Sequence, residues 1–165
     1  LEVDKFEFKM RSVELKDICR SVYNMFCQKT KPEVNFIFDD NILPSVFLYT
    51  DSKRLHQVLS NLIDNAVKFT NKGRIHFGYE IQSEENTDKQ FVRIYVEDTG
   101  IGIDKNYNHV LFDRFFKADN FTQGFGLGLP IAKKLTEEMG GELKFTSEMG
   151  LGSKFWIKIP IPSNS

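Results

Sequence analysis

Three short segments combine side chains and backbone that suit an anionic ligand. Residues 61–70 (NLIDNAVKFT) carry amides and a lysine, residues 98–103 (DTGIGI) place an aspartate before two glycines, and residues 124–129 (GFGLGL) repeat glycine at every second position. Amide and ammonium groups can bind phosphates and a metal ion, a carboxylate can accept a hydrogen bond from a base edge, and glycine-rich backbone can fold over a phosphate chain. Each segment alone is weak evidence, but together and in this order they predict a site for ATP.

The first segment lies on a predicted long helix. On a helical wheel its apolar side chains share one arc, the core face, formed by Leu55, Val58, Leu59, Leu62, Ile63 and Ala66. Asn61, Asn65 and Lys68 follow one another at i, i+4 and i+7 and occupy a neighbouring arc. They could be ordinary polar residues on a solvated helix face, but the glycine segments favour a cleft wall.

Other periodic stretches supply the elements that must position these segments. We expect an extended piece at 7–11 and three helices. The helices are at 14–28, at 129–139, and between them one that runs from an N-cap at 50–52 to about residue 69. Strands are expected at 35–38, 46–49, 74–83, 90–98, 142–147 and 153–160. Residues 104–126 have no convincing period and exceed an ordinary loop in length, which is typical of a functional lid or a disordered link. The glycine segments on either side favour the lid.

Composition fits one compact module. The chain has 165 residues, 41% of them hydrophobic, and its 22 Lys and Arg against 23 Asp and Glu give a net charge of -1. This balance offers no support for bulk electrostatic binding to nucleic acid or to a membrane surface. Cys19 and Cys27 form no disulfide framework or metal set and indicate buried thiols in a reducing cytoplasm. We find no run that could span a bilayer, and expect a piece of a longer cytoplasmic or membrane-anchored protein.

The three segments resemble the nucleotide site of the sensor histidine kinases, in the superfamily that includes gyrase, heat-shock chaperone and MutL ATPases. The resemblance covers about residues 14–160, and residues 112–117 (FDRFFK) resemble the phenylalanine box of the same kinases. It implies an α/β fold, a two-layer sandwich with a mixed sheet of about five strands and three helices on one face. Residues 1–165 would form a single catalytic ATP-binding domain, with 1–12 a link from an upstream dimerisation domain and 104–126 the ATP lid.

The resemblance assigns roles to the polar residues of the helix. The asparagine matching Asn65 holds the magnesium ion, while residues matching Asn61 and Lys68 reach the phosphates. ATP-hydrolysing relatives carry a glutamate where Asn61 stands, as general base for the attacking water. An amide cannot accept that proton, and Asp64 lies well round the wheel from Asn61, so we expect ATP to be held without rapid hydrolysis.

A base pocket is implied by the second segment. The aspartate matching Asp98 accepts a hydrogen bond from the adenine amino group, and Gly100 and Gly102 let the backbone approach the base, with Phe69 and Ile103 beside it. A strand-end aspartate before glycine is often a simple turn former, which is the alternative reading of Asp98.

The lid would close over the phosphates. Phe112 and Phe115 would anchor it, and Lys117 stands where many family members carry an arginine that approaches the terminal phosphate. Backbone near a helix N-terminus would receive phosphate oxygens, at Gly124, Gly126, Leu127, Gly128 and Leu129. Phe125 departs from the small or hydroxylated residue usual there, and the lid is a few residues short.

None of the three histidines, His56, His76 and His109, sits in the family's phosphoacceptor motif, so the acceptor is expected outside this chain. The resemblance implies a protein-histidine kinase that passes the γ-phosphate of ATP to a histidine on a dimerisation and phosphoacceptor domain, and onward to a response regulator receiver domain. We expect the isolated chain to be monomeric and inactive by itself. Two alternatives stay open: a related serine kinase of the anti-sigma factor type, and a degenerate nucleotide-binding regulatory module.

Overall fold

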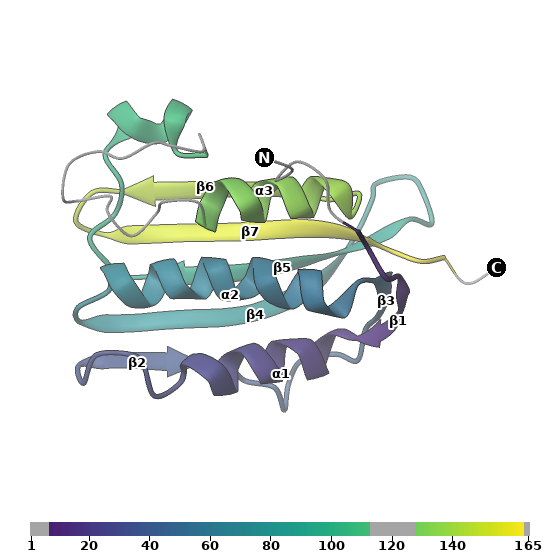
Figure 1. The fold of residues 1–165 in the computed structure, drawn as a ribbon, viewed down its shortest axis with the longest axis horizontal. Coiled ribbons are helices and arrows are strands. Elements are labelled where there is room, and N and C mark those ends of the chain that lie inside the picture. The colour runs from purple at the N-terminus through teal and green to yellow at the C-terminus, as the bar shows by residue number, and fades with distance from the viewer. Residues whose placement is uncertain (1–6, 113–127, 164–165) are drawn as a thin grey trace.

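Two layers make up the fold in the computed structural model, which describes residues 7–112 and 128–163 (Figure 1). Within these residues three α-helices, α1 (Leu15–Phe26), α2 (Ser52–Phe69) and α3 (Gly128–Glu138), lie side by side on one face of a sheet. A short 3-10 helix, η1 (Lys105–Val110), follows the central strands. The predicted α/β sandwich is confirmed.

The main sheet has five strands in the order β2-β4-β5-β7-β6. Its members are β2 (Val34–Ile37), β4 (Gly73–Ser83), β5 (Gln90–Asp98), β6 (Glu142–Glu148) and β7 (Gly152–Ile161). The β2–β4 pair is parallel and the other pairs are antiparallel, so the sheet is mixed as predicted. A separate pair, β1 (Arg11–Glu14) and β3 (Phe47–Thr50), packs at one end of the helical layer.

Alternation along β5 decides where the carboxylate of Asp98 lies. Successive side chains of a strand point to opposite faces, and Val92, Ile94 and Val96 are buried on the face toward the helices. Asp98 continues this buried series, whereas Glu97 falls on the other face and is only half-buried. The strand thus delivers a carboxylate to the boundary between the layers.

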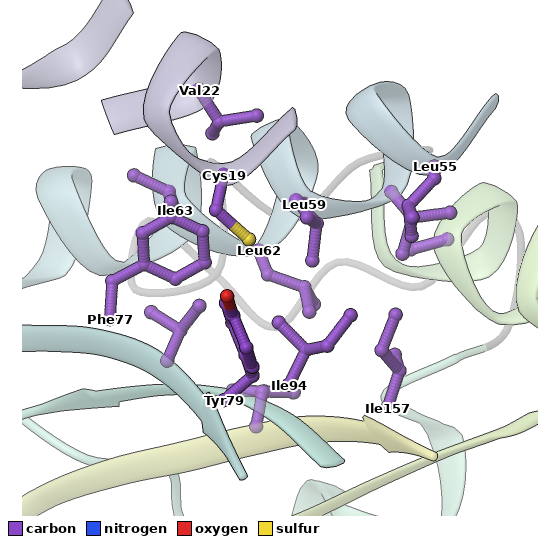
Figure 2. Close-up of a cluster of buried hydrophobic side chains, with 14 of the residues drawn as sticks. Cys19, Val22, Leu55, Leu59, Leu62, Ile63, Phe77, Tyr79, Ile94 and Ile157 are labelled. Carbon is purple, nitrogen blue, oxygen red and sulfur yellow. The ribbon is translucent and has the colours of Figure 1, made fainter. Parts of the chain in front are cut away.

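Helix α2 lies across the middle of the sheet and carries much of the core. It begins at an Asp51 N-cap, whose Oδ1 accepts hydrogen bonds from the amides of Lys53 at 3.0 Å and Arg54 at 3.2 Å. Figure 2 shows its apolar side chains meeting those of α1 and of β4, β5 and β7; the labelled residues are Cys19, Val22, Leu55, Leu59, Leu62, Ile63, Phe77, Tyr79, Ile94 and Ile157. The predicted core arc of α2 is confirmed.

Some element boundaries differ from the prediction. The first strand is Arg11–Glu14, not 7–11, because its partner β3 fixes the register from outside the local sequence. It overlaps the range 1–12 that was expected to be a link, and the amide of Lys9 also donates to Asp51 Oδ2 at 2.7 Å. Within 104–126, where no regular structure was predicted, η1 forms behind an Asp104 cap. The linking role itself stays a prediction.

Of the two cysteines expected to be buried, only Cys19 is fully buried. Cys19 is completely buried, which raises the pKa of its thiol, and Cys27 is half-buried; both are free. No helix in the part of the chain that the structure describes has the length and apolar character needed to cross a membrane.

Candidate functional site

The last turns of α2 meet the end of β5 at a narrow pocket. Its walls combine apolar residues with three polar ones; the lining residues are Asn65, Ala66, Phe69, Asp98, Gly102, Ile103, Ser153 and Phe155. It offers a water molecule about 10 Å³ of room, which is close to the minimum that holds one. Residues predicted from two separate segments therefore come together, as the nucleotide-site prediction requires.

Asp98 is the buried carboxylate of this pocket, with 9% of its surface exposed. Its Oδ1 accepts hydrogen bonds from the amides of Gly100 at 2.9 Å and Ser153 at 3.3 Å. Burial raises the pKa of Asp98 from 3.8 to about 6, with a further increase from the charge of Glu97, while the two amides oppose the rise. An ionised carboxylate in such a place has a strong preference for an additional donor.

Glycine is required at two positions of the loop after β5. A side chain at Gly100 would collide with the carbonyl oxygen of Phe69 and lie 2.9 Å from Asp98 Oδ1. Gly102 has φ +76, and a side chain there would collide with the carbonyl oxygen of Glu148. The loop is thus pressed between α2 and the β6–β7 turn, which brings its backbone to the edge of the pocket.

Asn65 is the unsatisfied polar group of the pocket. The residue is 5% exposed, and its Nδ2 has no hydrogen-bond partner among residues 7–112 and 128–163. A buried amide in that state costs free energy, and such a group calls for an explanation. Because rotating the amide exchanges its oxygen and nitrogen, the same position can offer either a donor or an oxygen ligand. A phosphate oxygen would satisfy the nitrogen, and a metal ion would bind the oxygen of this amide.

The two other predicted polar residues of α2 lie differently. Asn61 Nδ2 donates to the carbonyl oxygen of Gly128 at 3.1 Å and so joins α2 to the first residue of α3. The ammonium of Lys68 lies 2.8 Å from Asp64 Oδ2, and both side chains are about half exposed. Neither Asn61 nor Lys68 lines the narrow pocket.

The lid residues are mostly beyond what the structure describes. Phe115, Lys117, Gly124, Phe125, Gly126 and Leu127 all lie outside the described residues. Phe112 packs against the ring of Phe145 with centroids 5.6 Å apart, which fits its predicted anchoring role. Leu129 is completely buried in the core, so its side chain does not face a ligand.

Sequence reasoning missed the contribution of β7. Ser153 lines the pocket and donates its amide to Asp98, while Gly152, with φ +130, has no room for a side chain beside the carbonyl oxygen of Asp98. The segment Gly150-Leu151-Gly152 was interpreted only as a turn. The two glycines just before Ser153 were the signal in the sequence that this turn lies close to the backbone of another segment.

The histidines and the acidic residues within 7–112 and 128–163 form no metal centre of their own. His56 lies on α2 between Ser21 and Ser60, His76 is on β4 with its ring against Tyr95, and His109 is exposed in η1. In the described part of the chain no three His, Cys, Asp or Glu residues are grouped as metal ligands. A metal ion at this site would need oxygen atoms from its nucleotide in addition to Asn65.

Comparisons with known proteins identify the family of this chain. The family model described as "Histidine kinase-, DNA gyrase B-, and HSP90-like ATPase" matches residues 50–163, a range that contains the whole pocket. The chain belongs to this family of ATPase domains. Its relatives and structural neighbours are histidine kinases.

Two relatives show the extent of the similarity. The autoinducer 2 sensor kinase/phosphatase LuxQ of Vibrio vulnificus is 36% identical over 98% of this chain, which spans 19% of that protein. The sensor histidine kinase GacS of Pseudomonas protegens is 37% identical over 98% of this chain, which spans 18% of GacS. The chain therefore corresponds to about a fifth of these multidomain relatives.

Solved structures place the same fold in histidine kinases. The catalytic domain of histidine kinase ThkA aligns with a TM-score of 0.72 and 26% identity, covering 93% of this chain and 97% of that domain. Full-length ShkA, solved in complex with AMPPNP, aligns with a TM-score of 0.75 and 27% identity, covering 97% of this chain and 33% of ShkA.

Proposed function

We propose that this domain binds ATP with magnesium in the pocket between α2 and β5 and presents the terminal phosphate to a histidine on a separate phosphoacceptor domain. The observation that carries the proposal is the meeting of a buried carboxylate, Asp98, and an unsatisfied buried amide, Asn65, in one apolar pocket. The membership of the family of ATPase domains and the histidine kinase relatives support it.

The base would be held at the Asp98 end. The carboxylate accepts a hydrogen bond from the exocyclic amine, with Oδ1 already fixed by the amides of Gly100 and Ser153. Phe69 and Ile103 supply apolar walls for the ring. Because the pocket has room for about one water molecule, the side chains that line it must rearrange to admit a purine.

The phosphates would extend along the last turns of α2. Asn65 is the residue that would hold magnesium, through its amide oxygen; the ion, when bound, neutralises phosphate charge. Asn61 lies one turn earlier on α2 and contacts the beginning of α3. Lys68 would exchange its exposed ion pair with Asp64 for a phosphate oxygen, at small cost because surface pairs are weak. Lys117 is proposed to add a second positive charge.

Transfer to a histidine needs alignment and charge neutralisation more than a base. An imidazole nitrogen is itself the nucleophile, so the domain need not remove a proton from it. Asn61 stands where hydrolytic relatives carry a glutamate, and its amide is occupied by the Gly128 carbonyl. We therefore expect the domain to hold ATP with slow hydrolysis, and a receiver domain to take the phosphate from the phosphohistidine.

Binding comes first in the test. Calorimetry with ATP and magnesium should show binding to the wild-type domain and none measurable to Asp98→Ala, because a buried charged partner of the base is lost. Glu97→Ala is the matched control, since Glu97 is the adjacent residue on the opposite face of β5. Unchanged affinity in Asp98→Ala would refute the role of this carboxylate.

Phosphotransfer is tested with radiolabelled ATP, with and without a matching dimerisation and phosphoacceptor domain. We expect acid-labile label on the added domain only. Stable label on serine would favour the serine-kinase alternative, and binding without any transfer would favour the regulatory module. Label on His56, His76 or His109 of the isolated chain, or rapid release of phosphate, would contradict the proposal.

A further inference from the structure

The hydroxyl of Ser147 joins three backbone or side-chain groups beside the pocket. Its Oγ accepts a hydrogen bond from the amide of Ile103 at 2.8 Å, lies 2.7 Å from Ser153 Oγ, and lies 3.1 Å from the carbonyl oxygen of Gly152. Ser147 is half-buried on β6, whereas its partners belong to the loop after β5 and to β7. One hydroxyl thus connects three separate segments.

Hydrogen-bond capacity accounts for all three contacts. A serine hydroxyl donates once and accepts twice. If Ser147 donates to the Gly152 carbonyl, it can accept from Ile103 and from the hydroxyl of Ser153, and its capacity is filled. An alanine would leave the Ile103 amide and the Gly152 carbonyl without this partner, and both of these residues are largely buried.

Two of the three partners of Ser147, Ile103 and Ser153, line the nucleotide pocket. Ile103 is 3% exposed, lines the pocket, and directly precedes residues 104–126. Ser153 lines it too, and its amide donates to Asp98 Oδ1 at 3.3 Å. The same turn makes a second connection, from the amide of Gly150 to the carbonyl oxygen of Ile101 at 2.9 Å. The β6–β7 turn therefore holds the loop 98–103 at several points.

We propose that Ser147 is a positioning residue for nucleotide binding: its hydroxyl fixes Ile103 and Ser153 in the places where they complete the pocket around Asp98. The inference rests on the proposed function. Ser147 is not among the residues that line the pocket, so it acts through Ile103 and Ser153 and not by contact with the base.

The first expected effect is on affinity. Ser147→Ala should weaken ATP binding about five- to tenfold, the size of one or two lost hydrogen bonds. Inorganic tripolyphosphate, which has no base, should bind both proteins alike. Ser147→Thr keeps the hydroxyl and should restore most of the ATP affinity. Ser45→Ala, which removes a 2.6 Å hydrogen bond to Glu14 at the other end of the fold, is the matched control and should bind as the wild type does.

A second effect distinguishes positioning from general destabilisation. The Ser153 amide helps to keep the pKa of Asp98 from rising further, so loosening Ser153 should raise that pKa and move the loss of ATP binding to higher pH. The wild type and Ser147→Ala have the same charged residues around Asp98, which are Arg74 on β4, Glu97 on β5, Glu148 on β6 and Lys154 on β7. A shift of the pH midpoint therefore reports the position of Ser153.

Titration of the wild type, Ser147→Ala and Ser147→Thr with ATP from pH 5 to 8 tests the inference, with thermal unfolding as the check on folding. If Ser147→Ala does not fold, Ser147→Cys replaces it in the experiment. Cysteine is close to serine in volume but is a weak hydrogen-bond donor and acceptor. Affinity and pH midpoint equal to the wild type would overturn the role of Ser147, as would equal losses in the alanine and threonine variants. Absence of ATP binding by the wild type would instead overturn the proposed function.

Discussion

Replacing Asp98 by asparagine should make the domain more stable and at the same time impair nucleotide binding. Burial raises the pKa of this carboxyl from 3.8 to about 6, so ionising it in the folded state is unfavourable. The folded protein binds the proton more tightly than the unfolded chain, and the free energy of unfolding therefore falls as pH rises from about 4 to about 6. Above that window the cost is complete, at about 3 kcal/mol for a rise of roughly two units.

Asparagine is neutral and nearly isosteric, and its oxygen can still accept from Gly100 and Ser153. Asp98→Asn should thus raise the free energy of unfolding by up to about 3 kcal/mol at pH 7.5 and leave it nearly unchanged below pH 4. ATP binding should weaken about ten- to hundredfold, because a charge-assisted hydrogen bond becomes a neutral one. A functional residue that lowers stability is the expected sign of a ligand site.

Urea unfolding at pH 7.5 and pH 3.5 gives the stabilities, and calorimetry gives the affinities. Glu97→Gln is the control, since it removes a neighbouring negative charge from the half-exposed face of the same strand. A variant that is less stable than the wild type at pH 7.5, or a gain that is equally large at pH 3.5, would show that burial of the charge is not the cause.

Other predictions follow from the same pocket. Lowering the pH from 7.5 to 5 should weaken ATP binding about tenfold through protonation of Asp98, whose pKa is about 6. The loss of affinity that comes from Asp98 should be missing in Asp98→Asn, and an identical pH dependence in the wild type and in Asp98→Asn would contradict this prediction. Asn65→Ala should weaken binding of ATP with magnesium more than binding of metal-free ATP, and equal losses would exclude Asn65 as the metal ligand. Gly102→Ala should cost more than about 1 kcal/mol of stability, and more than Gly140→Ala, because both have positive φ but only Gly102 faces a backbone collision; equal costs in urea unfolding would argue against that collision.

Local periodicity was enough to predict the parts of the site that depend on one element. The helical wheel predicted the core arc of α2, and Asn65 lies at its edge, buried as a cleft residue should be. The position of Asp98 at the end of a strand-like run was also visible in the sequence. Its alternation with Val96 then fixes which face it occupies.

Contacts between elements could not be read in the same way. Ser147 and Ser153 become partners of the pocket only when the β6–β7 turn packs on the loop after β5, which no local pattern encodes. The need for glycine at 102 likewise arises from the distant carbonyl of Glu148. Lys68 shares an arc with Asn65 on the wheel, but its long, flexible side chain pairs with Asp64.

Amide chemical shifts during titration of the isotope-labelled domain with ATP and magnesium test the central proposal most directly. We expect the largest changes at Asn65, at residues 98–103 and at Ser153, and small ones on the opposite face of the sheet, for example at Arg93 and Trp156. The same titration with Asp98→Ala should show almost none of them. Changes concentrated away from the pocket, or equal changes in the wild type and Asp98→Ala, would contradict ATP binding at this site.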